Sequence, residues 1–118
     1  MSTANGVATK LGARKRARAP VDEHAATELD LYIENTSELY PQKLAIMENF
    51  KRRIARQKYD PSLAWKLWMY WVDAGARRYV KESGSGTSGS VFNKPTREKV
   101  AKDLAKHYTP TRIVAGDY

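Results

Sequence analysis

The residues of this chain that are best suited to chemistry are clustered arginines and lysines. They form three groups: Arg14, Lys15, Arg16 and Arg18; Lys51, Arg52, Arg53, Arg56 and Lys58; and Arg77 and Arg78. An arginine can hold a phosphate group or the edge of a guanine through two parallel hydrogen bonds. The chain has 21 Lys and Arg against 13 Asp and Glu, which gives a net charge of +8. This excess and its clustering make polyanions the first partners to consider, with DNA and RNA foremost.

The middle group lies on a segment with helical periodicity. The apolar stripe of that segment consists of Ile46, Met47, Phe50 and Ile54. Because successive helix residues are rotated by about 100°, Arg52, Arg53 and Arg56 share the opposite side. This side is the best candidate for a surface that contacts nucleic acid. A solvated helix face is the alternative interpretation, and the basic N-terminal segment adds weight to binding.

Residues 1–22 are predicted to form a disordered basic arm. Residues 1–20 hold five basic side chains, no acid and little that could be buried. An arm that contacts phosphates and a tail that only increases solubility both fit this composition. A nuclear address is a further interpretation of the same cluster.

Candidate catalytic residues are few. His24 and His107 are the only histidines, there is no cysteine, and the two histidines are not spaced as metal ligands. The most interesting acid is Asp73, for which a salt bridge to Arg77, four residues later, is the favoured interpretation. No nucleotide-binding or hydrolase signature is present. We therefore predict a protein that is not an enzyme and that uses neither a cofactor nor a metal ion.

All three tryptophans, Trp65, Trp68 and Trp71, lie within seven residues. Aromatic side chains can stack on the bases of single-stranded nucleic acid. A spacing of three residues drifts around a helix, however, so the three rings cannot all face one ligand. Packing in the core is the favoured interpretation, and a tryptophan left exposed would mark a surface for a partner.

A helix predicted over residues 60–80 must position these residues. Asp60 is placed to cap it, and Pro61 suits its first turn. Apolar residues cover nearly all of its circumference, including a stripe made of Leu63, Leu67, Tyr70, Trp71 and Ala74. Such a helix is normally buried on several sides, so the other helices are expected to pack around it. Gly75 inside this helix predicts either the close approach of a neighbour or a kink.

Three further helices are predicted, over residues 25–38, over residues 41–58, and from Asn93 or Thr96 to His107. The acidic surface of the first is expected to pair with a basic helix. Residues 83–90 contain only Ser, Gly and Thr and are predicted to be a flexible loop, after which Val91 and Phe92 dock on the core. The predicted fold is all-α: a compact four-helix domain over residues 23–109 around the central apolar helix, with a C-terminal tail over residues 110–118.

No membrane association is predicted. The longest apolar run, Leu67–Val72, is much shorter than the roughly 20 residues that span a bilayer. The N-terminus also lacks the apolar centre of a secretion signal. A cytoplasmic location is therefore expected, in the cytoplasm of the host cell if the protein is encoded by a phage.

Several short segments carry a diffuse resemblance to other proteins. These segments are Leu31–Asn35, Tyr59–Asp60, Lys66–Tyr70, Val72–Ala76 and Thr96–Arg97. Over roughly residues 29–105, excluding the loop, the chain resembles small uncharacterised proteins of bacteriophage and plasmid genomes. The resemblance implies a small helical accessory protein of a mobile element and carries no active site. The basic N-terminus and the Ser/Gly loop depart from that pattern.

These observations together predict a non-enzymatic accessory protein that binds nucleic acid. The residues predicted to contact phosphates are the eleven basic residues named first, and weak sequence specificity is expected. The alternative is a protein-interaction or virion-structural protein that forms homo-oligomers through an aromatic surface or binds an acidic protein partner.

Overall fold

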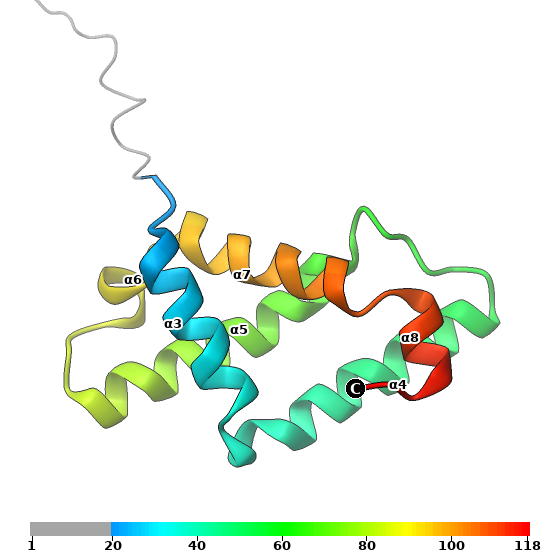
Figure 1. Ribbon diagram of the computed structural model, residues 1–118, viewed down its shortest axis with the longest axis horizontal. Coiled ribbons are helices and arrows are strands. Elements are labelled where there is room, and N and C mark those ends of the chain that lie inside the picture. The colour runs from blue at the N-terminus through cyan, green and yellow to red at the C-terminus, as the bar shows by residue number, and fades with distance from the viewer. Residues whose placement is uncertain (1–19) are drawn as a thin grey trace, which may run out of the picture.

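The computed structural model describes residues 20–118, and this range is all-helical (Figure 1). Helices contain 76% of it and strands contain none of it, which confirms the all-α prediction. The longer helices are α3 (Glu23–Glu34), α4 (Tyr40–Ala55), α5 (Ala64–Ser83) and α7 (Lys94–His107), and the shorter ones are η1 (Ser37–Leu39), α6 (Ser88–Val91) and α8 (Pro110–Ala115). The predicted set of four helices therefore omitted three short elements.

The structure moves the N-terminal boundary of the folded domain. Arg14, Lys15, Arg16 and Arg18 of the predicted arm lie outside the described residues. Residues 20–22, which were assigned to the arm, are instead fixed to α7. The Asn93 Nδ2 group donates to the Pro20 carbonyl (3.1 Å), and the Asp22 amide donates to Thr96 Oγ1 (3.0 Å). Asp22 also caps α3, because its carboxylate accepts from the Ala25 amide (3.0 Å).

Helix α3 ends at Glu34, four residues earlier than predicted. The reason is local competition from polar side chains. Asn35 Nδ2 donates to the Leu31 carbonyl (2.8 Å), and the Thr36 hydroxyl donates to the Tyr32 carbonyl. The chain then makes the single turn η1 and enters α4, with Pro41 in the first turn of α4.

The joint between α4 and α5 is longer than predicted. The Asp60 carboxylate accepts from both the amide (2.9 Å) and the hydroxyl (2.7 Å) of Ser62, which closes a turn in place of a helix cap. This hydrogen bonding also lowers the pKa of Asp60. As a result, α5 begins at Ala64 and not at Asp60 or Pro61.

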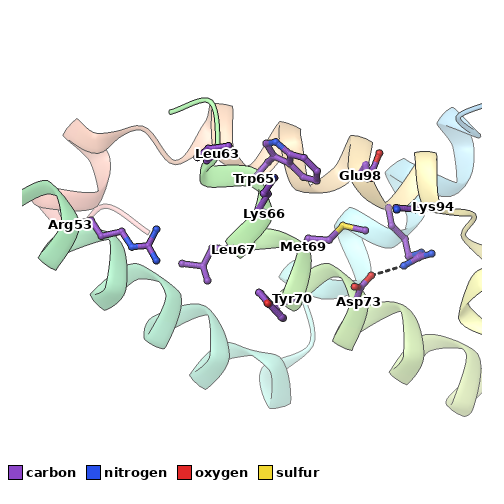
Figure 2. Close-up of a pocket in the computed structure, with 11 residues that line it drawn as sticks. Arg53, Leu63, Trp65, Lys66, Leu67, Met69, Tyr70, Asp73, Lys94 and Glu98 are labelled. Atoms are coloured by element: carbon purple, nitrogen blue, oxygen red, sulfur yellow. Dashed lines mark hydrogen bonds and ion pairs between the residues drawn. The ribbon is translucent and has the colours of Figure 1, made fainter. Parts of the chain in front are cut away.

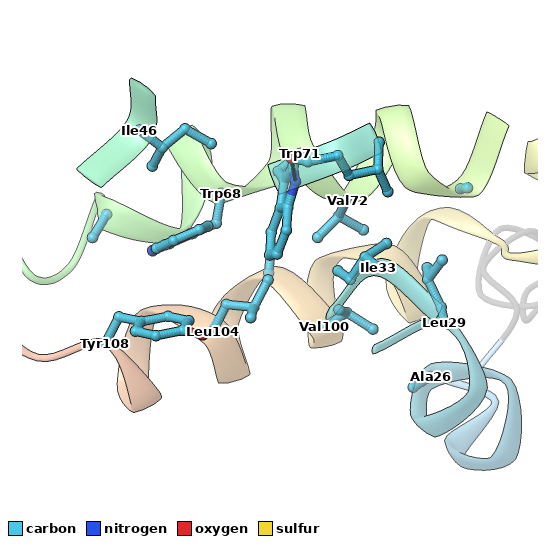
Figure 3. Close-up of a cluster of buried hydrophobic side chains, with 14 of the residues drawn as sticks. Ala26, Leu29, Ile33, Ile46, Trp68, Trp71, Val72, Val100, Leu104 and Tyr108 are labelled. Carbon is cyan, nitrogen blue, oxygen red and sulfur yellow. Dashed lines mark hydrogen bonds between the residues drawn. The ribbon is translucent and has the colours of Figure 1, made fainter. Parts of the chain in front are cut away.

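Helix α5 lies at the centre of the fold and packs against α3, η1, α4, α6 and α7. Figure 3 shows α5 and α7 side by side, with Trp68, Trp71, Leu104 and Tyr108 between them. The Trp68 ring is fully buried and lies 5.2 Å from the Tyr108 ring, 5.6 Å from the Trp71 ring and 5.8 Å from the Phe50 ring, measured between centroids. Aromatic contacts of this kind join α4, α5 and the end of α7 into one core.

Gly75 lies where α3 crosses close to α5. A Cβ atom at this position would overlap Cγ2 of Ile33 and would lie 3.5 Å from Cδ1 of Leu39. Ile33 and Leu39 are themselves buried. The glycine therefore permits the close approach of a neighbour, one of the two explanations that the sequence left open.

The C-terminal third differs most from the predictions. The Ser/Gly segment contains α6, because Thr87 and Ser90 form a reciprocal capping box at its start. Phe92 then docks on the core, as predicted, and is fully buried. The predicted C-terminal tail is wrong: residues 110–115 form α8, which packs on α4 and buries Ile113 completely. Ile113, Val114 and Ala115 form one short apolar group of which only Ile113 is buried, so the sequence showed no periodic pattern.

Within residues 20–118, no helix combines the length and the apolar character needed to cross a membrane.

Candidate nucleic-acid interface

The end of α4 brings four of the predicted residues together. Arg52, Arg53, Arg56 and Lys58 are all exposed, and they line one surface hollow of about 380 Å³ together with Asn49. We refer to these four side chains as the α4 basic cluster. A set of converging cationic side chains on a concave surface is suited to hold a polyanion.

Backbone geometry explains why Lys58 joins the arginines. Gln57 adopts a left-handed conformation (φ 58°), and the Lys58 amide donates to the Arg53 carbonyl (2.7 Å). This hydrogen bond turns the chain back over the last turn of α4. The cationic side chains also lie at the negative end of the helix dipole, which favours them there.

The α4 basic cluster is electrostatically uncompensated within the described part of the chain. No carboxylate of residues 20–118 lies within 4.0 Å of a charged nitrogen of Arg52, Arg53, Arg56 or Lys58. Their positive charge is therefore available to a ligand, because no ion pair within residues 20–118 neutralises it.

Lys51 differs from the residues next to it because it has internal partners. It forms an ion pair with Glu48 (3.3 Å), and its ammonium group lies 5.5 Å from the centre of the Tyr118 ring. Hydrogen bonding to Tyr118 and to Glu48 raises the pKa of Lys51, so the group stays cationic but is partly neutralised. Lys51 thus lies beside the α4 basic cluster without belonging to it.

The structure does not bring Arg77 and Arg78 to the same place. Both lie in the second half of α5, and Figure 1 shows α4 and α5 ending at opposite ends of the molecule. Arg78 forms ion pairs with Glu38 (3.4 Å) and Glu82 (3.3 Å). Arg77 is exposed and has no ion pair within the described residues.

The expected salt bridge between Asp73 and Arg77 is wrong. Asp73 instead accepts from Nη1 of Arg97 at 2.7 Å, and Nε of Arg97 donates to the Phe92 carbonyl at 2.9 Å. Asp73 therefore faces α7 and not the next turn of its own helix. Spacing within one helix could not reveal a partner from another helix.

An open groove along the outer side of α5 was not foreseen. It has a volume of about 600 Å³, and Leu63, Trp65, Leu67, Met69 and Tyr70 form its apolar wall. Leu63 is 50% exposed and Tyr70 is 68% exposed, although both were expected to lie in a buried stripe. The buried side of α5 is centred instead on Trp68, Val72 and Ala76. We refer to this feature as the α5 groove.

Charged residues complete the α5 groove. Figure 2 shows Arg53 reaching in from α4, Lys94 and Glu98 placed along α7, and Asp73 joined to its partner by a dashed line. Lys66 of α5 and Arg97 of α7 also line it. The sequence did carry a signal for this groove: apolar residues surround α5 almost completely, while the described chain has too few other helices to cover every side.

The tryptophans divide between the core and the surface. Trp68 and Trp71 are buried, and the Trp71 indole N–H donates to the Leu39 carbonyl (2.8 Å), so core packing is confirmed for both. Trp65 is only half-buried, and the ammonium group of Lys102 lies 4.9 Å from its ring centre. Trp65 is therefore the tryptophan of α5 that a ligand can reach.

No group of three or more His, Asp or Glu side chains within residues 20–118 is arranged to hold a metal ion. Comparisons with protein-family models, with curated proteins and with solved structures found no match for this chain. The resemblance to phage and plasmid proteins thus stays a prediction, and the function is inferred from the residues themselves.

Proposed function

We propose that this chain is a non-enzymatic, nucleic-acid-binding accessory protein that contacts phosphates through the α4 basic cluster. The observation that carries this proposal is the convergence of Arg52, Arg53, Arg56 and Lys58 on one hollow with no carboxylate partner in the described chain. Uncompensated cations release the condensed counterions of a nucleic acid when they meet its phosphates, and this release drives binding. Contacts to phosphates carry no sequence information, so weak sequence specificity is proposed.

The N-terminal arm is proposed to strengthen the same binding. Its residues Lys10, Arg14, Lys15, Arg16 and Arg18 add five positive charges. Their contribution is additive to that of the α4 basic cluster and depends on salt in the same way.

The test is a salt series of binding to random-sequence DNA and RNA, measured by fluorescence anisotropy. The full chain is compared with a chain that lacks residues 1–19 and with the double variant Arg52→Gln/Arg56→Gln. Each lost phosphate contact lowers the slope of log K against log salt by roughly 0.7 to 0.9, so the double variant should lose about 1.5. The truncated chain should show a further loss of slope.

A matched control is available near the C-terminal end of α5, away from the α4 basic cluster. Arg77 and Lys81 are exposed and have no ion pair within the described residues, so Arg77→Gln/Lys81→Gln removes the same charge elsewhere. The control should bind almost as well as the unaltered chain. Equal losses in both double variants would mean that only net charge matters, and absence of binding at low salt would refute the proposal.

A protein-interaction or virion-structural role is the second candidate. The observation that favours it is the exposure of Leu63 and Tyr70 on α5, since apolar side chains in a contiguous open groove are typical of interfaces. Sedimentation equilibrium over a range of concentrations distinguishes the two. Self-association that Tyr70→Ala abolishes, in a chain without affinity for nucleic acid, would support this second role.

A further inference from the structure

The α4 basic cluster does not stand alone on the surface. Arg53 lines both the hollow of that cluster and the α5 groove, so the two hollows adjoin. Trp65 in turn lines both the α5 groove and a third hollow of about 610 Å³, which also includes Tyr59, Lys102 and Lys106. The three hollows therefore form one track that runs from the end of α4, across α5, to α7.

This track is strongly cationic. Its three hollows together are lined by nine basic side chains and two carboxylates. One of the carboxylates, Asp73, is neutralised by Arg97 at 2.7 Å, which leaves Glu98 as the other. A ligand that follows the track must therefore carry negative charge along its length.

The track also presents aromatic faces between the cations. Tyr70 is 68% exposed in the middle hollow, and Trp65 is half-buried at the junction with the third. Nucleic-acid bases stack on such rings only when they are not already stacked in a duplex. Cations beside an exposed aromatic ring, as at Tyr70, are the arrangement that single-strand binders use.

We propose that the ligand of this track is single-stranded nucleic acid, with its phosphates on the α4 basic cluster and an unstacked base on Tyr70. This inference rests on the function proposed above and specifies its substrate. It explains why α5 leaves Leu63 and Tyr70 open beside the cluster, which contact with duplex phosphates alone does not require.

A second copy of the chain fits the same surface poorly. A symmetric dimer through the track would place the same face of both copies together. The basic side chains of one copy would then meet those of the other, and juxtaposed like charges oppose association. The charge of the track thus favours a polyanion over self-association.

The experiment compares three probes of about 16 nucleotides, a length in the range that single-strand binders cover. They are an oligodeoxythymidine, an abasic strand with the same phosphates, and a duplex hairpin. The full chain should bind the thymidine strand most tightly. Tyr70→Ala should weaken that binding about tenfold, because stacking of one base is lost. Binding of the abasic strand and of the hairpin should change less than about twofold.

Two variants control for the change at residue 70. Tyr70→Phe keeps the ring and should retain the affinity for the thymidine strand. Tyr40→Ala removes another exposed tyrosine, 46% exposed in a hollow lined by Glu34 and Lys43, and should change none of the three affinities. Quenching of tryptophan fluorescence by the thymidine strand should disappear in Trp65→Phe, since Trp68 and Trp71 are buried.

The outcomes separate the two proposals. Equal affinity for the thymidine strand, the abasic strand and the hairpin, unaffected by Tyr70→Ala, would overturn the single-strand inference and leave phosphate binding intact. A dimer that dissociates in Tyr70→Ala while affinity for all probes is unchanged would also overturn it, in favour of a second copy. Failure of every probe to bind at low salt would instead refute the proposed function itself.

Discussion

The acidic surface of α3 and η1 and the α4 basic cluster show two opposite uses of charge. On the acidic side, Glu34 pairs with Lys43 (3.2 Å) and accepts from the Tyr108 hydroxyl (3.1 Å), and Glu38 pairs with Arg78 (3.4 Å). The α4 basic cluster has no such partner within the described chain. Helix α4 contains both extremes, with Lys43 buried near its start and exposed arginines in its last turn.

This difference distinguishes charges that hold helices together from charges that remain available to a ligand. Lys43 lies with its ammonium group 4.7 Å from the centre of the Tyr108 ring and beside Glu34, so its charge holds α3, α4 and the end of α7 together. Burial opposes that charge, but hydrogen bonds and electrostatic attraction from Tyr108 and Glu34 outweigh burial and raise the pKa of Lys43. We infer that the paired side contributes to stability and that the unpaired side contributes to binding.

The largest change in stability is expected where the acidic side packs most closely. Gly75→Ala would force the new methyl group against Ile33, and overpacking of this kind costs about 2–3 kcal/mol. Urea denaturation monitored by tryptophan fluorescence measures the loss. Gly89→Ala, at a glycine with open space around it, is the control and should cost much less. A stability close to that of the unaltered chain would mean that α3 can shift away from α5.

Removal of the Lys43 charge is expected to have the next largest effect. Lys43→Ala should cost about 2 kcal/mol, less than for a fully buried ion pair because Glu34 remains partly exposed. Lys43→Met keeps most of the packing and should cost less. Because the pKa of Lys43 is raised in the folded state, its contribution should persist at neutral pH and decline only as pH rises above the ordinary value of 10.5. Denaturation midpoints across alkaline pH check this, and a contribution lost well below that value would contradict it.

A smaller effect, in this case a gain in stability, is expected at Gln57, in the turn between Arg56 and Lys58 of the α4 basic cluster. Gln57 has a φ of 58°, where Gly84 and Gly116 occupy the corresponding positions after α5 and α8 with φ of 69° and 73°. Gln57→Gly should relieve this strain and raise the free energy of unfolding by about 0.5–1 kcal/mol. Thermal denaturation provides the measurement. A loss of stability would show that the side chain of Gln57 makes a contact worth more than the strain.

A still smaller gain in stability is expected when Asp30, on the acidic side, is replaced by asparagine. Burial, together with the charges of Glu34 and Asp103, raises the pKa of Asp30, while His107 partly opposes the shift. The folded state therefore holds this proton more tightly than the unfolded chain, and ionisation at neutral pH reduces stability. Asp30→Asn should raise stability at neutral pH by about 0.5 kcal/mol or less, since the group is partly exposed. The gain should vanish below the ordinary pKa of 3.8, as urea titrations at several pH values would show.

The smallest change in stability is expected for the variant with the largest effect on binding. Arg52→Gln/Arg56→Gln removes two exposed, unpaired charges, so the free energy of unfolding should change by less than about 0.5 kcal/mol. Any change should be a gain in stability, because repulsion between neighbouring positive charges is removed. A large loss in urea denaturation would mean that these arginines support the fold, and the contrast between the two surfaces would then fail.

The sequence predicted the helices and the central place of the Trp-rich segment because those depend on periodicity and caps. Asn93, for example, was one of two residues predicted to cap the last long helix, and it caps α7 by accepting from the Thr96 amide at 3.0 Å. Most of the α4 basic cluster was foreseen in the same way, since Arg52, Arg53 and Arg56 share one side of the helix predicted over residues 41–58.

The sequence did not predict features that arise between elements. The partner of Asp73 comes from α7, twenty-four residues away, and no local pattern indicates it. The exposure of Leu63 and Tyr70 depends on which sides of α5 are covered, and α5 offered apolar residues on almost every side. Ile113 was missed because one buried residue in a six-residue helix produces no periodicity.

Helix α8 has a mechanical consequence. It follows directly after α7 and packs on α4, and its contact with α4 is more extensive than the direct contact between α4 and α5. Helix α8 therefore links α4 to the C-terminal end of α7 and restricts how far the two can move apart. We infer that the packing of α8 on α4, with Ile113 buried, keeps the α4 basic cluster in line with the α5 groove. A substitution that weakens the packing of Ile113 should let the α4 basic cluster and the α5 groove move relative to each other while each keeps its own structure. Faster amide hydrogen exchange in the last turns of α4 would reveal this motion.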